Sequence, residues 1–86
     1  MDYVRILWDD PDDPYGNVQH IDDHGLSIDD VEFVLTNPMS EGKSNSSGFP
    51  CVWGNTPDGR YIMTVYDEID EDTIRVVTAY EVPEPR

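Results

Sequence analysis

The sequence predicts a small α+β domain, in which an N-terminal strand and a two-helix hairpin precede a three- or four-stranded antiparallel sheet. Three observations support this class. β-Branched and aromatic residues form short runs near the start and in the second half of the 86 residues. Two stretches with helical periodicity lie between those runs, separated by a glycine. Turn residues divide the later β-rich runs. We therefore expect residues 1–86 to form one domain, with both helices on one face of the sheet.

The first strand is expected at Tyr3–Trp8, and the acidic segment Asp9–Pro14 is expected to be a loop. Asp13-Pro14 is typical of an N-cap followed by proline at the first helical position. A short helix is therefore predicted from this point to about His24. Its apolar positions are Tyr15, Val18 and Ile21, spaced by three residues.

A corner and a second helix are predicted next. Gly25 is placed to end the first helix in the left-handed conformation. Ser27 and Asp30 have the spacing of a capping box, and Asn37-Pro38 is expected to end the second helix, because the residue before proline disfavours the α region. The apolar face of this helix consists of Ile28, Val31, Val34 and Leu35.

The second half contains the sheet. Met39–Gly48 is polar and rich in serine and glycine, and is either a flexible loop or a weak edge strand. Strands are predicted at Pro50–Thr56, Arg60–Asp67 and Thr73–Val82. Strict alternation in the last strand places Ile74, Val76, Thr78 and Tyr80 on one face, opposite Arg75, Val77, Ala79 and Glu81.

Charge is the most unusual property of the chain. Nineteen acids face five lysines and arginines, which gives a net charge of −14. Ten acids lie in residues 1–33 and seven in residues 67–84, whereas residues 34–66 carry Glu41 and Asp58 against Lys43 and Arg60. Such a field repels phosphate backbones and attracts cations or basic partners, unless it serves only as a solvated surface.

Other features bear on the compartment. The N-terminal residues lack the pattern of a signal peptide, and no run approaches the roughly 18 apolar residues of a membrane span. Cys51 is the single cysteine, which excludes an internal disulfide and suits a reducing environment. These observations predict a cytoplasmic protein that makes no membrane contact.

Several short sequences occur in an order that resembles a known family. They are Trp8-Asp9, a helix bearing Asn17, His24-Gly25-Leu26-Ser27, an acidic helix ending in Asn37-Pro38, Gly59-Arg60, and Ile74 to Ala79. This order resembles the BrnT family of type II toxins, which are small ribonucleases with a RelE-like α+β fold. The resemblance covers about residues 5–82. It implies a cytoplasmic ribonuclease neutralised by an antitoxin protein.

The resemblance also implies functional residues. Arg60 and Arg75 would position phosphate or stabilise charge in the transition state, and His24 would act as acid or base. Two departures concern the charge of the site. Asp23 precedes His24 where a lysine or arginine is expected, and Tyr80 replaces an arginine in the closing strand. Tyr80 retains the capacity to donate a hydrogen bond or stack on a base.

Structural alternatives exist for each candidate. His20 and His24 share one helical face, but the chain has no further histidine to complete a typical metal site, so no metal or cofactor is expected. His24 suits a capping role at the C-terminus of the first helix, where a cation is favoured, better than a metal site. Arg60 and Arg75 equally suit ion pairs with nearby carboxylates.

Two functional hypotheses follow. The first is a toxin of a toxin–antitoxin pair with a weakened or altered ribonuclease site, in which RNA binding is electrostatically disfavoured. The second is a non-catalytic acidic interaction module on the same fold that binds a basic partner. A homodimer is a possible assembly in either case.

Overall fold

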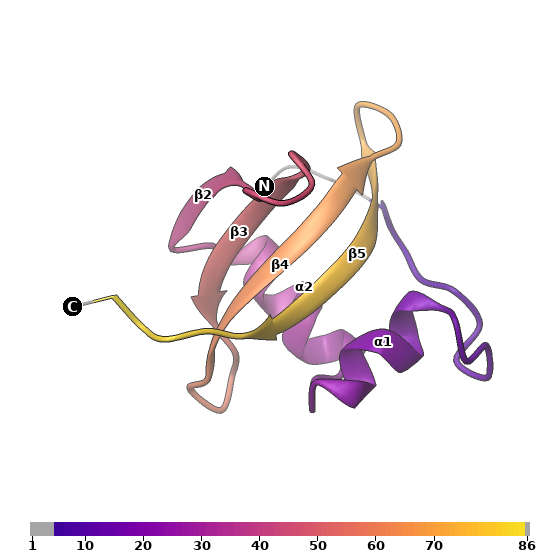
Figure 1. Cartoon of the computed structure of the whole chain (residues 1–86), viewed down its shortest axis with the longest axis horizontal. Coiled ribbons are helices and arrows are strands. Elements are labelled where there is room, and N and C mark those ends of the chain that lie inside the picture. The colour runs from indigo at the N-terminus through magenta and orange to yellow at the C-terminus, as the bar shows by residue number, and fades with distance from the viewer. Residues whose placement is uncertain (1–4, 86) are drawn as a thin grey trace.

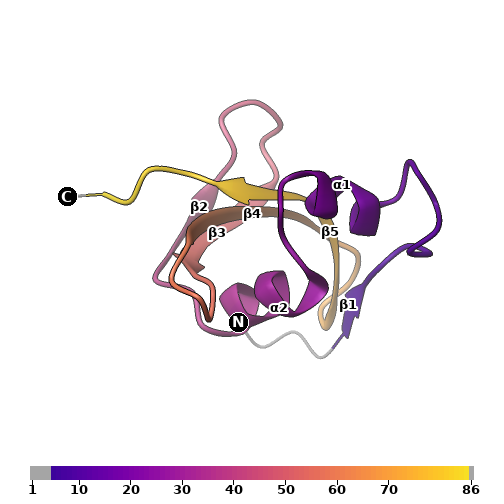
Figure 2. The same cartoon turned by 90° about the horizontal axis from the view of Figure 1, so that it is seen from below.

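A five-stranded mixed sheet forms the centre of the structure, with the strands in the order β1-β5-β4-β3-β2. Figure 1 labels β2 to β5, and Figure 2 shows β1 beside β5. This computed structural model, which describes residues 5–85, confirms the α+β class. The elements are β1 (Arg5–Leu7), α1 (Asn17–Asp23), α2 (Ile28–Thr36), β2 (Ser40–Lys43), β3 (Pro50–Asn55), β4 (Tyr61–Glu68) and β5 (Thr73–Glu81).

The sheet combines an antiparallel meander with one parallel strand. β2, β3, β4 and β5 pair antiparallel, so the larger of the two predicted strand numbers is correct. Within Met39–Gly48, β2 forms the weak edge strand, and a turn follows it. β1 joins the other edge, where Arg5 pairs with Thr73 in a parallel ladder. Tyr3 and Val4 of the predicted first strand lie outside the described residues.

The start of α1 differs from the prediction. Asp13 is not its N-cap, because the Asp13 carboxylate accepts a hydrogen bond from the N–H of Tyr15, two residues on, at 2.9 Å. This bond forms an Asx-type turn before the helix. Gly16 is the N-cap, with an extended backbone. Tyr15 therefore precedes the helix and is 96% exposed instead of contributing to its apolar face.

The corner between the helices forms as predicted. Gly25 has a φ of 77°, and its N–H donates to the carbonyl of Asp22 while the N–H of Leu26 donates to that of Ile21. These two bonds are those of a Schellman motif. Ser27 and Asp30 form both hydrogen bonds of the capping box, at 3.0 and 3.1 Å. The turn therefore satisfies the backbone groups that two adjoining helix ends would leave unpaired.

The two helices occupy different positions on the sheet. α2 lies within the curve of the sheet, whereas α1 lies beside β5 (Figure 2). The two helices therefore do not share one face of the sheet as predicted. The Trp8 indole N–H donates to Glu32 at 2.9 Å and links the end of β1 to α2. Neither helix among residues 5–85 has the length and hydropathy needed to cross a bilayer. The core cluster comprises Ile21, Leu26, Val31, Val34, Leu35, Val52, Ile62, Tyr66, Ile74, Val76 and Ala79.

A β-bulge in β5 places several of its side chains on the opposite face from the one that strict alternation predicts. Val65 pairs with Thr78, but the next residue of β4, Tyr66, pairs with Val76, so one residue of β5 is unmatched. A bulge of this kind reverses the alternation beyond it. Ala79 therefore joins Ile74 and Val76 in the core, and the predicted face that united Thr78 and Tyr80 with Ile74 is wrong. Thr78 and Tyr80 lie instead on the face opposite α2, with Arg75.

Candidate functional site

Arg60 connects the β3–β4 turn to the helix corner. Its Nη1 donates to the carbonyl of Gly25 at 2.6 Å, its Nη2 to Asp30 at 3.0 Å, and its Nε to Asp58 at 3.0 Å. The hydrogen bond to Asp58 raises the pKa of Arg60 above its usual value. A phosphate group would have to displace a carboxylate to reach this guanidinium. Arg60 thus has the ion-pair partners that the structural alternative requires.

The turn before Arg60 is itself hydrogen-bonded. The Thr56 hydroxyl donates to Asp58 and accepts from the backbone N–H of Arg60 at 3.0 Å. Hydrogen bonds from Thr56 and then Arg60 lower the pKa of Asp58 below its usual value of 3.8. Asp58 is therefore a fixed anion at neutral pH, which keeps Arg60 directed at the corner.

Arg75 belongs to a second polar network, away from the corner. Its Nη2 donates to Asp9 Oδ2 at 2.6 Å, and the same oxygen accepts from the backbone N–H of Asn17 at 2.8 Å. Arg75 pairs with Leu7 at the end of β5 that β1 covers. The structure therefore does not bring Arg75 together with Tyr80, which lies near the other end of the strand.

Asn17 is the centre of that network. It is 3% exposed, and its amide donates to the carbonyls of Leu7 at 3.1 Å and Val76 at 2.9 Å. Its side-chain oxygen accepts from the N–H of Asp9 at 2.8 Å. Asn17 therefore joins α1 to both β1 and β5, at the point where the parallel ladder ends.

His24 and Tyr80 meet at the helix corner. Their ring centroids are 5.9 Å apart, and the His20 ring packs edge-on against His24 at 5.2 Å. The Tyr80 hydroxyl contacts the sulfur of Met63 at 3.6 Å. Because Arg60 contacts Gly25, the structure gathers three of the four predicted residues, His24, Arg60 and Tyr80, around one corner. Residues 5–85 contain no group of three or more His, Cys, Asp or Glu side chains arranged to hold a metal ion.

The face opposite α2, which we term the open face, carries a row of large side chains. Trp53, Met63 and Tyr80 are direct cross-strand neighbours on β3, β4 and β5. A cavity of about 540 Å³ on this side is lined by Glu41, Gly42, Lys43, Ser44, Asn45, Ser46, Trp53, Met63 and Tyr80.

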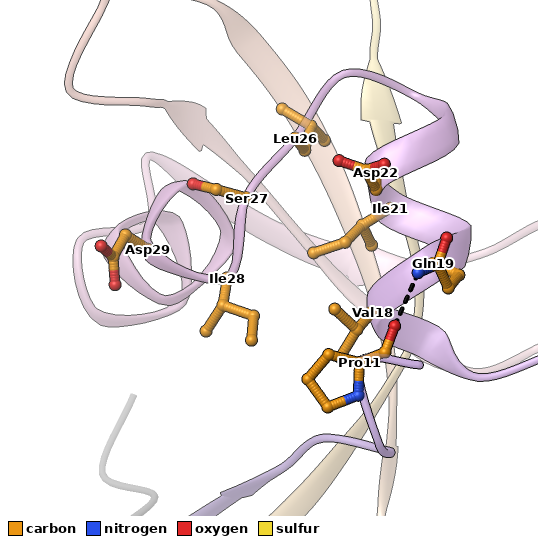
Figure 3. Close-up of a pocket in the computed structure, with 9 residues that line it drawn as sticks. All are labelled: Pro11, Val18, Gln19, Ile21, Asp22, Leu26, Ser27, Ile28 and Asp29. Atoms are coloured by element: carbon orange, nitrogen blue, oxygen red, sulfur yellow. Dashed lines mark hydrogen bonds between the residues drawn. The ribbon is translucent and has the colours of Figure 1, made fainter. Parts of the chain in front are cut away.

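A groove between the two helices was not predicted. It has a volume of about 410 Å³ and is lined by Pro11, Val18, Gln19, Ile21, Asp22, Leu26, Ser27, Ile28 and Asp29 (Figure 3). Its walls are largely apolar, and Asp22 on α1 and Asp29 on α2 flank it from opposite sides. The half-buried state of Val18 and Ile28 reflects this groove. Their apolar character was visible in the sequence, but it equally fitted a fully packed helix pair.

Eight of the exposed acids lie on one side of the molecule. The loop before α1, α1 itself and the β4–β5 loop lie away from β2 in both views (Figures 1 and 2). We term this the acidic side. Its exposed acids are Asp10, Asp12, Asp13, Asp22, Asp23, Asp70, Glu71 and Asp72. Eight carboxylates on one side of a small domain create a negative potential that favours basic partners.

Comparison with known proteins gives no family assignment: the chain matches no protein-family model, no curated protein and no solved structure. The geometry of the described residues therefore carries the functional argument. It offers an apolar groove beside concentrated negative charge, and two arginines already bound to carboxylates.

Proposed function

We propose that this protein is a non-catalytic interaction module on a BrnT-like fold, and that its acidic side binds a basic partner protein. One observation carries the proposal. Arg60 and Arg75, the cations that a ribonuclease site would direct at phosphate, are both held in ion pairs with the chain's own carboxylates. An RNA backbone would therefore meet mainly negative charge at both positions.

The groove between the helices would determine which basic partner the acidic side binds. Its apolar walls suit a leucine- or isoleucine-like anchor, and Asp22 and Asp29 at its sides suit lysine or arginine residues next to that anchor. The partner we propose is thus a basic segment with an apolar side chain at its centre. By the family resemblance, an antitoxin is the first protein to test. The single buried cysteine supports a reducing compartment such as the cytoplasm.

Fluorescence anisotropy with labelled peptides tests the proposal. The probe is an amphipathic peptide of arginine and leucine, and the matched probe replaces its leucines with glutamines at the same charge. We expect salt-sensitive binding of the leucine peptide and at least about tenfold weaker binding of the glutamine peptide, because apolar burial in the groove is lost. A single-stranded RNA of similar length should not bind at 0.15 M salt.

Matched variants locate the binding surface. Asp22→Asn with Asp29→Asn should weaken the leucine peptide about five- to tenfold, because two exposed charge pairs contribute up to roughly 1 kcal/mol each. Glu41→Gln with Glu84→Gln removes the same charge from exposed positions away from the groove and should change the affinity less than about twofold. The proposal is wrong if neither peptide nor any basic antitoxin binds, or if RNA binds tightly.

A ribonuclease toxin is the second candidate, because His24, Arg60 and Tyr80 gather at one corner. Histidine, tyrosine and arginine are residue types suited to acid–base chemistry on phosphate. Adding the protein to a cell-free translation reaction tests this candidate, with His24→Ala as the control. Intact mRNA and unchanged translation, at both low and moderate salt, would eliminate it.

A further inference from the structure

β2 leaves one edge of the sheet open. It is the last strand in the sheet order, and all four of its residues are exposed. An edge strand presents unpaired N–H and C=O groups that another strand is able to bind. The backbone directions and the charges of β2 determine which kind of strand is able to pair with it.

The ladder shows which residues direct their backbone outward. The N–H of Ser44 donates to the carbonyl of Phe49 at 2.8 Å. Because bonded and non-bonded pairs alternate in an antiparallel ladder, Gly42 also faces Cys51 with its backbone groups turned inward. Glu41 and Lys43 therefore direct theirs toward the open edge. Lys43 lies opposite Pro50, which has no N–H to donate and thus fits a non-bonded position.

The charges around this edge differ from those of the acidic side. Residues 34–66 carry Glu41, Asp58, Lys43 and Arg60, so this part of the chain is neutral overall. Asp58 and Arg60 pair with each other in the β3–β4 turn. Glu41 and Lys43 remain as the two charges of the edge strand itself.

We propose that the β2 edge binds the β2 edge of a second copy of this chain, antiparallel and centred on Gly42. In this register Glu41 of each copy lies directly opposite Lys43 of the other, and the outward backbone groups of both residues form hydrogen bonds. If the pairing were centred on residue 41 instead of Gly42, the two copies of Glu41 would lie opposite each other. If it were centred on residue 43, the two copies of Lys43 would do so. The charge pattern therefore selects a single register and produces one continuous sheet across both copies.

The expected dimer is weak. The paired segment has four residues, so its interface falls below the standard size for stable complexes. Met39, which is 65% exposed and directly precedes β2, adds apolar area. The acidic sides lie away from the interface, which limits repulsion between the copies. We expect a dissociation constant of about 10–100 μM in moderate salt.

Charge reversal provides the test. In Glu41→Lys both edge charges are positive, and in Lys43→Glu both are negative, so each variant alone should be monomeric. Mixing the two variants restores both opposite-charge pairs, at the same total charge as a wild-type pair, and should restore the dimer. The double variant E41K/K43E should also dimerise, because its pairs are exchanged rather than lost. Glu71→Lys makes the same charge change as Glu41→Lys in the β4–β5 loop and should leave dimerisation intact.

Sedimentation velocity from about 10 μM to 1 mM in 0.3 M NaCl measures the masses, and circular dichroism verifies that each variant is folded. We expect dimers for the wild type, the mixture, the double variant and Glu71→Lys. We expect monomers for each of the two single variants. A wild-type protein that remains monomeric at 1 mM overturns the proposal. Dimers that persist in both single variants, or a mixture that stays monomeric, also overturn it, since pairing would then lie elsewhere or follow another register.

Discussion

Replacing Asn17 by alanine should destabilise the fold more than any other single asparagine substitution among residues 5–85. The Asn17 side chain makes three hydrogen bonds, to Leu7, Val76 and Asp9, at 3.1, 2.9 and 2.8 Å. Truncation removes all three and leaves their backbone partners to find water at a position where Asn17 itself is 3% exposed. The substitution therefore tests whether this network holds α1, β1 and β5 together.

The magnitude follows from these contacts. Each hydrogen bond contributes about 1 kcal/mol net, and unpaired buried groups add to the loss, so we expect about 3–4 kcal/mol. A chain of 86 residues has a total stability of about 4–13 kcal/mol. The variant should therefore lose a quarter or more of its stability, and its Tm should fall by at least about 12 °C.

Urea unfolding followed by the fluorescence of Trp8 and Trp53 measures this loss. Asn55→Ala is the matched control, because the Asn55 side chain is half-exposed and makes one long hydrogen bond of 3.4 Å to Gly59. The control should cost less than about 0.5 kcal/mol. Equal losses for the two variants, at unchanged m-values, would refute the role assigned to Asn17.

Three further predictions concern other parts of the fold. Thr64→Val should raise the free energy of unfolding by about 1–2 kcal/mol, because the Thr64 hydroxyl is fully buried and has no hydrogen-bond partner among residues 5–85. Chemical denaturation measures this change, and a destabilised variant would show that the hydroxyl has a partner. Asp58 has a lowered pKa, so its contribution to stability is complete above its usual value of 3.8 and disappears as pH falls through the folded-state pKa. Asp58→Asn should accordingly flatten the acid side of the stability curve, and an unchanged curve would contradict the pairing. Burial raises the pKa of the Cys51 thiol. Iodoacetamide at pH 8 should therefore modify the native protein at least about 100-fold more slowly than the urea-unfolded chain, and mass spectrometry measures both rates. Equal rates would mean that β3 opens readily.

The features that the sequence predicted best depend on neighbouring residues. Ser27 and Asp30 form their capping box, and Gly25 adopts a positive φ, because each interaction is completed within a few residues. The failed prediction at Asp13 also concerned a local signal. The Asp13 carboxylate is able to accept a backbone hydrogen bond either as a helix N-cap or in an Asx turn. The sequence does not show which of these two bonds is the more stable.

Features that depend on distant residues were predicted less well. The bulge in β5 follows from pairing with β4, so simple alternation misplaced Thr78 and Tyr80. The partners of Arg60 and Arg75 include Asp30 and Asp9, which lie 30 and 66 positions away along the chain. In a chain with so many acids, sequence could predict that the arginines would find carboxylates, but not which ones.

The parallel pairing of β1 with β5 has a consequence for how the chain folds. The contacts Asn17–Val76 and Asp9–Arg75 join residues separated by 59 and 66 positions. Contacts between such distant residues slow folding, because a long loop must close before they form. During synthesis, β1 has no partner until β5 has left the ribosome. We therefore expect the helix corner and the meander to form first, with β1 and the Asn17 network completing the structure in a late step.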